Sequence, residues 1–88
     1  MMINDLEKIN YNKKFVVVYS KYSINIYESH SILNPKIVLK TKEISNIIFN
    51  PIVENMILVS FVDGSCKIPY FLEYLSRYFI HYIFYNNL

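Results

Sequence analysis

The chain has 88 residues, of which 53% are hydrophobic and 18% are charged. This composition is too apolar for an intrinsically disordered chain, and the length allows at most one small domain of marginal stability. The formal net charge is +2, and Arg77 is the one arginine among scattered lysines, so the sequence lacks the clustered cations of a nucleic-acid-binding surface. Composition therefore excludes disorder and argues against nucleic-acid partners.

The N-terminal residues 1–14 predict a weak edge element. The first residues have neither the basic start nor the apolar core of a secretory signal. Because Cys66 is the only cysteine, an internal disulfide is impossible. We therefore expect a cytoplasmic location.

Residues 15–68 carry a series of short segments with strand chemistry. β-branched and aromatic runs or period-two alternation predict strands at 15–20, 24–28, 36–40, 44–49, 56–61 and 65–68. The expected fold is mainly β, with four to six antiparallel strands in which residues 15–28 and 56–68 form two equivalent hairpins. Asp63-Gly64 is the strongest turn signal, since Gly64 tolerates a positive φ between two apolar runs.

The second predicted hairpin repeats the first after about 42 residues. Aligning the two places residues 16–19 on 58–61, Ser23 on Ser65, and Ile26 on Ile68. A repeat of this length is typical of β-propeller blades.

Residues 44–51 and 56–68 resemble the blade core of the WD-repeat family, in the order first strand, second strand, Asp-Gly turn and third strand. The resemblance implies one to two propeller-like blades. It also implies a hydrogen-bonded set of Trp, Ser or Thr, His and Asp that braces each blade. Here the matching positions offer Ser60 and Asp63, while Pro69 stands at the Trp position and no Gly-His pair precedes Ile44.

Residues 69–88 form an aromatic segment with three interpretations. Tyr70, Tyr74, Tyr78 and Tyr82 recur every four residues, a spacing that predicts a helix with a broad aromatic stripe. Alternatively, residues 78–84 are the outer strand of the second blade, because they fall on 36–42 at the same period. The segment could also be sequence read past an exon boundary, in which case the chain is a truncated gene model. Ionisable side chains within it argue against a membrane-spanning helix.

The sequence predicts no catalytic, cofactor-binding or metal site. His30 and His81 have no carboxylates at ligand spacing, and the serines near Asp63 have no neighbouring base. Cys66 is expected to be a small buried hydrophobe on a strand. Ser60, Asp63 and Gly64 are therefore predicted as structural turn and bracing residues.

The expected function is a non-catalytic protein-interaction or scaffold module that is a fragment of a larger WD-repeat-like propeller protein. Its partners would be proteins or peptides. The alternative is a small membrane-peripheral protein attached through the aromatic C-terminal helix. Self-association is expected if the chain is expressed alone, because an incomplete propeller leaves strand edges unpaired and the aromatic tail adds apolar surface.

Overall fold

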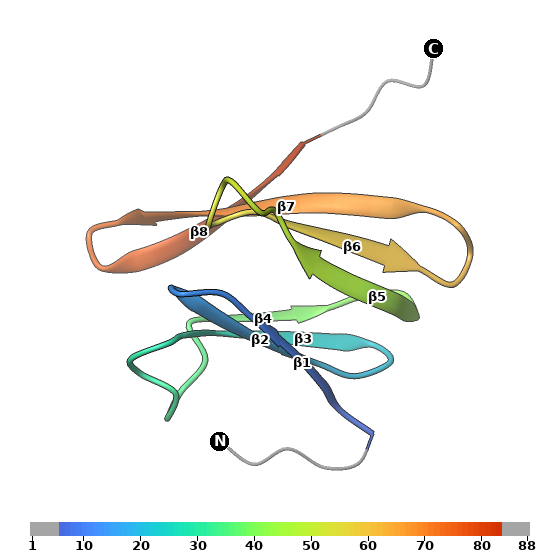
Figure 1. Cartoon of the computed structure of the whole chain (residues 1–88), viewed down its shortest axis with the longest axis horizontal. Helices are drawn as coiled ribbons and strands as arrows, with labels where there is room; N and C mark the ends of the chain where they lie inside the picture. The colour runs from blue at the N-terminus through green and yellow to red at the C-terminus, as the bar shows by residue number, and fades with distance from the viewer. Residues whose placement is uncertain (1–5, 84–88) are drawn as a thin grey trace.

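A computed structural model describes residues 6–83 as two four-stranded antiparallel sheets (Figure 1). The first sheet contains β1 (Lys8–Tyr11), β2 (Phe15–Tyr19), β3 (Ser23–Glu28) and β4 (Ile37–Lys40). The second contains β5 (Ile44–Phe49), β6 (Ile57–Phe61), β7 (Cys66–Tyr74) and β8 (Arg77–Ile83). Strands follow chain order in both sheets. The prediction of a mainly β fold is confirmed; residues 1–5 and 84–88 of the predicted terminal segments lie outside the described range.

The hydrophobic core lies between the two sheets, which are stacked in Figure 1. Alternate side chains of each central strand enter it: Phe15, Val17 and Tyr19 from β2, and Ile57, Val59 and Phe61 from β6. Phe71 of β7 packs edge-on against Phe15, with ring centroids 5.3 Å apart. Because side chains alternate along a strand, the other half of each strand faces away from this core.

The first strands of the two sheets, β1 and β5, lie side by side across the core and run in the same direction (Figure 1). The Asn10 Nδ2 group donates a hydrogen bond of 2.9 Å to the Ile47 carbonyl. Tyr19 adds a bond of 3.2 Å from its hydroxyl to the Asn46 side chain. These bonds join the two sheets along one edge.

The same asparagine turn ends the first strand of each sheet. The Asn12 side-chain oxygen accepts hydrogen bonds from the backbone N–H groups two and three residues later, at 2.9 and 2.8 Å. The Asn50 side-chain oxygen does the same, at 2.8 and 2.8 Å. Asn is suited to this position because its side chain can replace a backbone acceptor in a turn.

Two strands exceed the expected four to six. β1 was not predicted as a strand because it has four residues and carries Lys8 and Asn10, which weaken its apolar pattern. It nevertheless pairs with β2 from Lys8–Tyr19 to Tyr11–Val16. The other additional strand is β8, in the segment for which a helix or, as the alternative, an outer strand at 78–84 was predicted. The described part of that range, residues 78–83, agrees with the outer strand.

The predicted C-terminal helix is wrong for the described part of the segment. Residues 69–83 belong to β7 and β8, which pair from Ile68–Ile83 to Tyr74–Arg77. A spacing of four residues keeps side chains on one face of a strand as well as of a helix, since four is a multiple of the strand period of two. The aromatic and β-branched content then favours the strand.

The hairpin register divides the aromatic stripe between two faces. Tyr78 pairs with Glu73 and lies on the face of Phe71, toward the core, whereas Tyr74 pairs with Arg77 on the opposite face. Glu73 and Arg77 therefore point to opposite sides of the hairpin. The membrane-attached alternative loses its structural basis in residues 69–83, and no helix in the described range is long and apolar enough to span a bilayer.

The β7–β8 turn explains why the sequence did not favour a hairpin over a helix in this segment. Leu75 and Ser76 both have positive φ, of 52° and 62°, which is the type I′ geometry of two-residue hairpin loops. Asn-Gly is the usual sequence there, whereas Leu-Ser gives no turn signal and is strained in this conformation.

Replacing both turn residues (Leu75→Asn with Ser76→Gly) should stabilise the protein by roughly 1 kcal/mol, because Asn and Gly adopt positive φ more readily than Leu and Ser. Urea denaturation followed by circular dichroism measures the change. The matched control, Leu33→Asn with Ser31→Gly, alters residues of a different loop, whose φ values are not positive. A destabilised turn variant would contradict the type I′ assignment.

Candidate functional site

Three connections meet at one end of the two sheets. The β4–β5 loop crosses from the first sheet to the second and is fastened to both central turns. Thr41 N donates to the Tyr22 carbonyl at 2.9 Å, and Val62 N donates to the Glu43 carbonyl at 3.0 Å. We call this end, formed by residues 20–23, 41–43 and 62–65, the loop surface.

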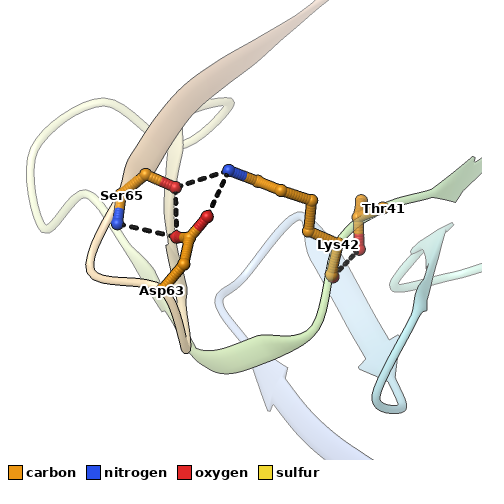
Figure 2. Close-up of polar contacts among 4 residues, drawn as sticks. All are labelled: Thr41, Lys42, Asp63 and Ser65. Atoms are coloured by element: carbon orange, nitrogen blue, oxygen red, sulfur yellow. Dashed lines mark hydrogen bonds and ion pairs between the residues drawn. The ribbon is translucent and has the colours of Figure 1, made fainter.

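A lysine, an aspartate and a serine form a hydrogen-bonded cluster on the loop surface (Figure 2). The Lys42 ammonium donates to Asp63 Oδ2 at 2.8 Å and to Ser65 Oγ at 2.7 Å. Asp63 Oδ1 accepts from the Ser65 backbone N–H at 2.9 Å and from its hydroxyl at 2.6 Å. The cluster therefore ties the crossing loop to the β6–β7 turn.

The Lys42 ammonium also lies 4.9 Å from the centre of the Phe61 ring, within the range of a cation–π contact. Half of the Lys42 and Asp63 side-chain surface is exposed, at 54% and 53%. Solvent screens such a pair, so its role is to position the loop more than to stabilise the fold.

The hydrogen bond from Lys42 is the main cause that holds the pKa of Asp63 well below its usual range. The bonds from the Ser65 hydroxyl and backbone N–H act in the same direction. These bonds favour the charged carboxylate, so their contribution to folding is present above the unfolded pKa of about 3.8. It is lost as the pH falls from that value toward the lower folded pKa.

Replacing the carboxylate (Asp63→Asn) should therefore lower the melting temperature at pH 6 and change it progressively less as the pH falls to 2. The measurement is a series of thermal melts of both proteins across this range. Because the site is exposed, the difference should also shrink in high salt. An equal difference at every pH would contradict the proposed charge of Asp63.

The three predicted bracing residues do not form one network. Asp63 belongs to the cluster and Gly64 to the turn beside it, but Ser60 lies on β6 and its carbonyl accepts a bond of 3.2 Å from Ser45 Oγ. Sequence reasoning missed Lys42, the central donor. No local pattern in the sequence distinguishes this lysine from the others.

Gly64 closes the β6–β7 turn with a φ of 89°. Its N–H donates to the Phe61 carbonyl at 3.0 Å, and the Phe61 N–H donates to Ser65 O at 2.9 Å. This pattern is a three-residue hairpin loop that needs a left-handed residue at its third position. A side chain at Gly64 would meet no atom within 4 Å, so the backbone alone restricts this site.

Replacing Gly64 by valine should destabilise the protein by about 1 kcal/mol or more, because a β-branched residue is strained at positive φ. Asparagine at the same site is the control, since it tolerates the left-handed region and should have a smaller effect. Thermal melting compares the two variants. Equal melting temperatures would show that backbone conformation does not limit this position.

The remaining chemistry-bearing residues stay apart. Cys66 is exposed, so its predicted burial is wrong: it pairs with Ser60 on the face of the sheet that points away from the core. His30 lies 3.2 Å from Glu28, whereas His81 stacks on Tyr70 at 5.3 Å. Within residues 6–83, no three His, Cys, Asp or Glu side chains are placed to hold a metal ion.

A hollow of about 330 Å³ lies near the start of β2, lined in part by Lys14, Phe15, Glu73 and Tyr78. Partial burial is the main cause that raises the pKa of Tyr78 to about 12, and Glu28 and Glu73 add to it. The lining mixes both charges with aromatic rings, and the Tyr78 hydroxyl donates a long hydrogen bond of 3.4 Å to the Glu73 carboxylate.

Comparisons of the chain with family models, with curated proteins and with solved structures found no match. The fold and the site together define a two-sheet antiparallel β protein. Its loop surface carries the hydrogen-bonded cluster of Lys42, Asp63 and Ser65.

Proposed function

We propose that this chain is a non-catalytic protein-interaction or scaffold module, in which the two sheets are successive WD-repeat-like propeller blades. The observation that carries the proposal is the equivalence of their backbone hydrogen bonds. Three bonds of the first sheet have counterparts in the second. The bond from Asn12 N to Phe15 O corresponds to the bond from Asn50 N to Met56 O. The bond from Ser20 N to Ser23 O corresponds to the bond from Phe61 N to Ser65 O. The bond from Ser29 N to Lys14 O corresponds to the bond from Phe71 N to Asn55 O.

These bonds define which residues correspond. The second strands match with a shift of 41 residues, as Ser20 to Phe61, and the third strands with a shift of 42, as Ser23 to Ser65. The alignment of Ser23 with Ser65 and of Ile26 with Ile68 is the same as in the sequence repeat. The alignment of β2 with β6 differs from the sequence repeat by one residue, because the turn that contains Gly64 is one residue longer than the turn between β2 and β3.

The equivalent asparagine turns give independent support. Asn12 and Asn50 correspond in the same matching, and each caps the end of a first strand with its side-chain oxygen. The two sheets thus share strand order, hydrogen-bond phase and a turn. Successive copies of one structural unit are the simplest account of all three.

The loop surface supplies the features of a recognition site. Loops carried on a rigid sheet scaffold are where such folds bind their partners. Lys21, Tyr22 and Val62 expose cationic, aromatic and apolar side chains there, next to the positioned Lys42. This mixture suits a protein or peptide partner.

A peptide-display selection against the immobilised chain tests this function. We expect enriched peptides whose binding is lost in the variant Lys21→Ala with Tyr22→Ala. The matched control, Lys13→Ala with Leu75→Ala, changes exposed residues of other turns and should retain binding. Failure to enrich any peptide, or binding that is indifferent to the loop variant, would contradict the proposal.

A further inference from the structure

The second sheet has an apolar outer face. Paired residues share a face, and the pairs Ile48–Leu58 and Ile68–Ile83 point away from the core. Leu72 and Phe79 continue this face along the β7–β8 hairpin. The residues of the pairs Ile48–Leu58 and Ile68–Ile83, together with their neighbours, line a hollow of about 290 Å³. We call this surface the second outer face.

The first sheet also has an apolar outer face. The pairs Tyr11–Val16 and Ile9–Val18 lie on it, and Val38 extends it at β4. Ile9, Tyr11 and Val38 are exposed, whereas Val18 and Tyr27 on the same face are buried. We call this surface the first outer face. Apolar faces on both sides of a small protein indicate interaction surfaces.

The matched hydrogen bonds relate these outer faces to the inner ones. The shift of 41 residues for the second strands aligns Val17, on the inner face of the first sheet, with Leu58, on the second outer face. The shift of 42 residues for the third strands aligns Ile26, also on the inner face, with Ile68, also on the second outer face. The pairing of Ile26 with Ile37 extends the match, because Ile68 pairs with Ile83. The second outer face therefore corresponds to the inner face of the first sheet.

The reverse correspondence holds for the first outer face. Val18 matches Val59 of the second inner face, and Tyr27 matches Pro69, which is also buried. The two inner faces already pack on one another in the core. Each outer face thus corresponds to one half of an interface that exists within the chain.

We propose that copies of this chain associate head to tail, with the second outer face of one copy packed on the first outer face of the next. This inference rests on the proposed repeat relation between the sheets. The new contact continues the established one, so its occupant is a second copy of the chain. Such a contact joins two different surfaces and produces a closed ring or an open series.

Two double variants test the assembly by sedimentation velocity over a range of concentrations. Ile48→Lys with Ile83→Lys blocks the second outer face, and Tyr11→Lys with Val38→Lys blocks the first. The unaltered chain should sediment well above its monomer mass of 10.6 kDa. Each double variant alone should weaken association by about tenfold or more, since it places charges within an apolar contact.

The decisive experiment mixes the two double variants. An equimolar mixture of the two double variants should form a 1:1 dimer, because each retains the face that the other lacks. The control Leu33→Lys with Ile52→Lys changes two exposed loop residues and should assemble normally. Circular dichroism verifies that all variants fold.

Three results would overturn the head-to-tail contact: a monomeric unaltered chain, a mixture that stays monomeric, or a double variant that assembles normally. The proposed function is tested separately at the loop surface. A monomeric chain that still binds peptides there would contradict the assembly and leave the interaction module intact.

Discussion

Replacing Phe71 by alanine should cost about 3–5 kcal/mol of folding free energy and leave the protein largely unfolded. Phe71 is 1% exposed and packs edge-on against Phe15, so its removal opens a cavity between the two sheets. A domain of this size, at the low end of roughly 0.05 kcal/mol per residue, has a total stability of about 4 kcal/mol, so a loss of this size removes most or all of it. Urea denaturation followed by far-ultraviolet circular dichroism measures the loss.

Phe79→Ala is the matched control for this prediction. Phe79 lies on the same hairpin but on its outward side, and it is 48% exposed. Its removal should change stability by less than about 1 kcal/mol in the monomer. Equal losses for the two phenylalanines would show that the hairpin does not present its faces as described.

Replacing Ile47 by aspartate should also unfold the protein, at a cost of about 3–5 kcal/mol, because it buries a charge without a partner. Ile47 is 1% exposed between the sheets. The buried carboxyl would have a raised pKa, so the variant should be less destabilised near pH 3, where the group is protonated, than near pH 7. Denaturation at both pH values measures this difference.

The neighbouring substitution Ile48→Asp provides the control. Ile48 is 47% exposed on the second outer face, so the same charge should leave the fold intact and weaken self-association. Opposite outcomes at adjacent positions are expected because side chains alternate across the sheet. A folded Ile47→Asp variant would contradict the register of β5.

Local signals in the sequence predicted the central hairpins well. The run at 15–19 and the Asp63-Gly64 turn carry their own conformational preferences, so the corresponding strands could be recognised without knowledge of the fold. The C-terminal hairpin carried no such signal. Its turn residues, Leu75 and Ser76, are strained in the conformation that they adopt, and tertiary pairing decides the outcome.

The cluster on the loop surface could be predicted only in part. Asp63 and Gly64 stand out because they form a local turn, but the partner of Asp63 lies 21 residues away. Lys42 has no distinguishing pattern among scattered lysines, and only the path of the crossing loop brings it to the turn. The one-residue change in the repeat alignment likewise depends on the length of that turn.

In the proposed repeat, equivalent residue pairs of the two sheets are either both hydrogen-bonded or both non-hydrogen-bonded, whereas the two sheets turn opposite faces toward the core. A nuclear Overhauser spectrum tests it most directly, since Hα atoms approach closely only in non-hydrogen-bonded antiparallel pairs. We expect strong Hα–Hα contacts for Tyr19–Ile24 and for Ser60–Cys66, with Tyr19 but not Ser60 contacting the other sheet through its side chain. A strong Hα–Hα contact for Val59–Lys67 instead would reverse the phase of the second hairpin and contradict the repeat.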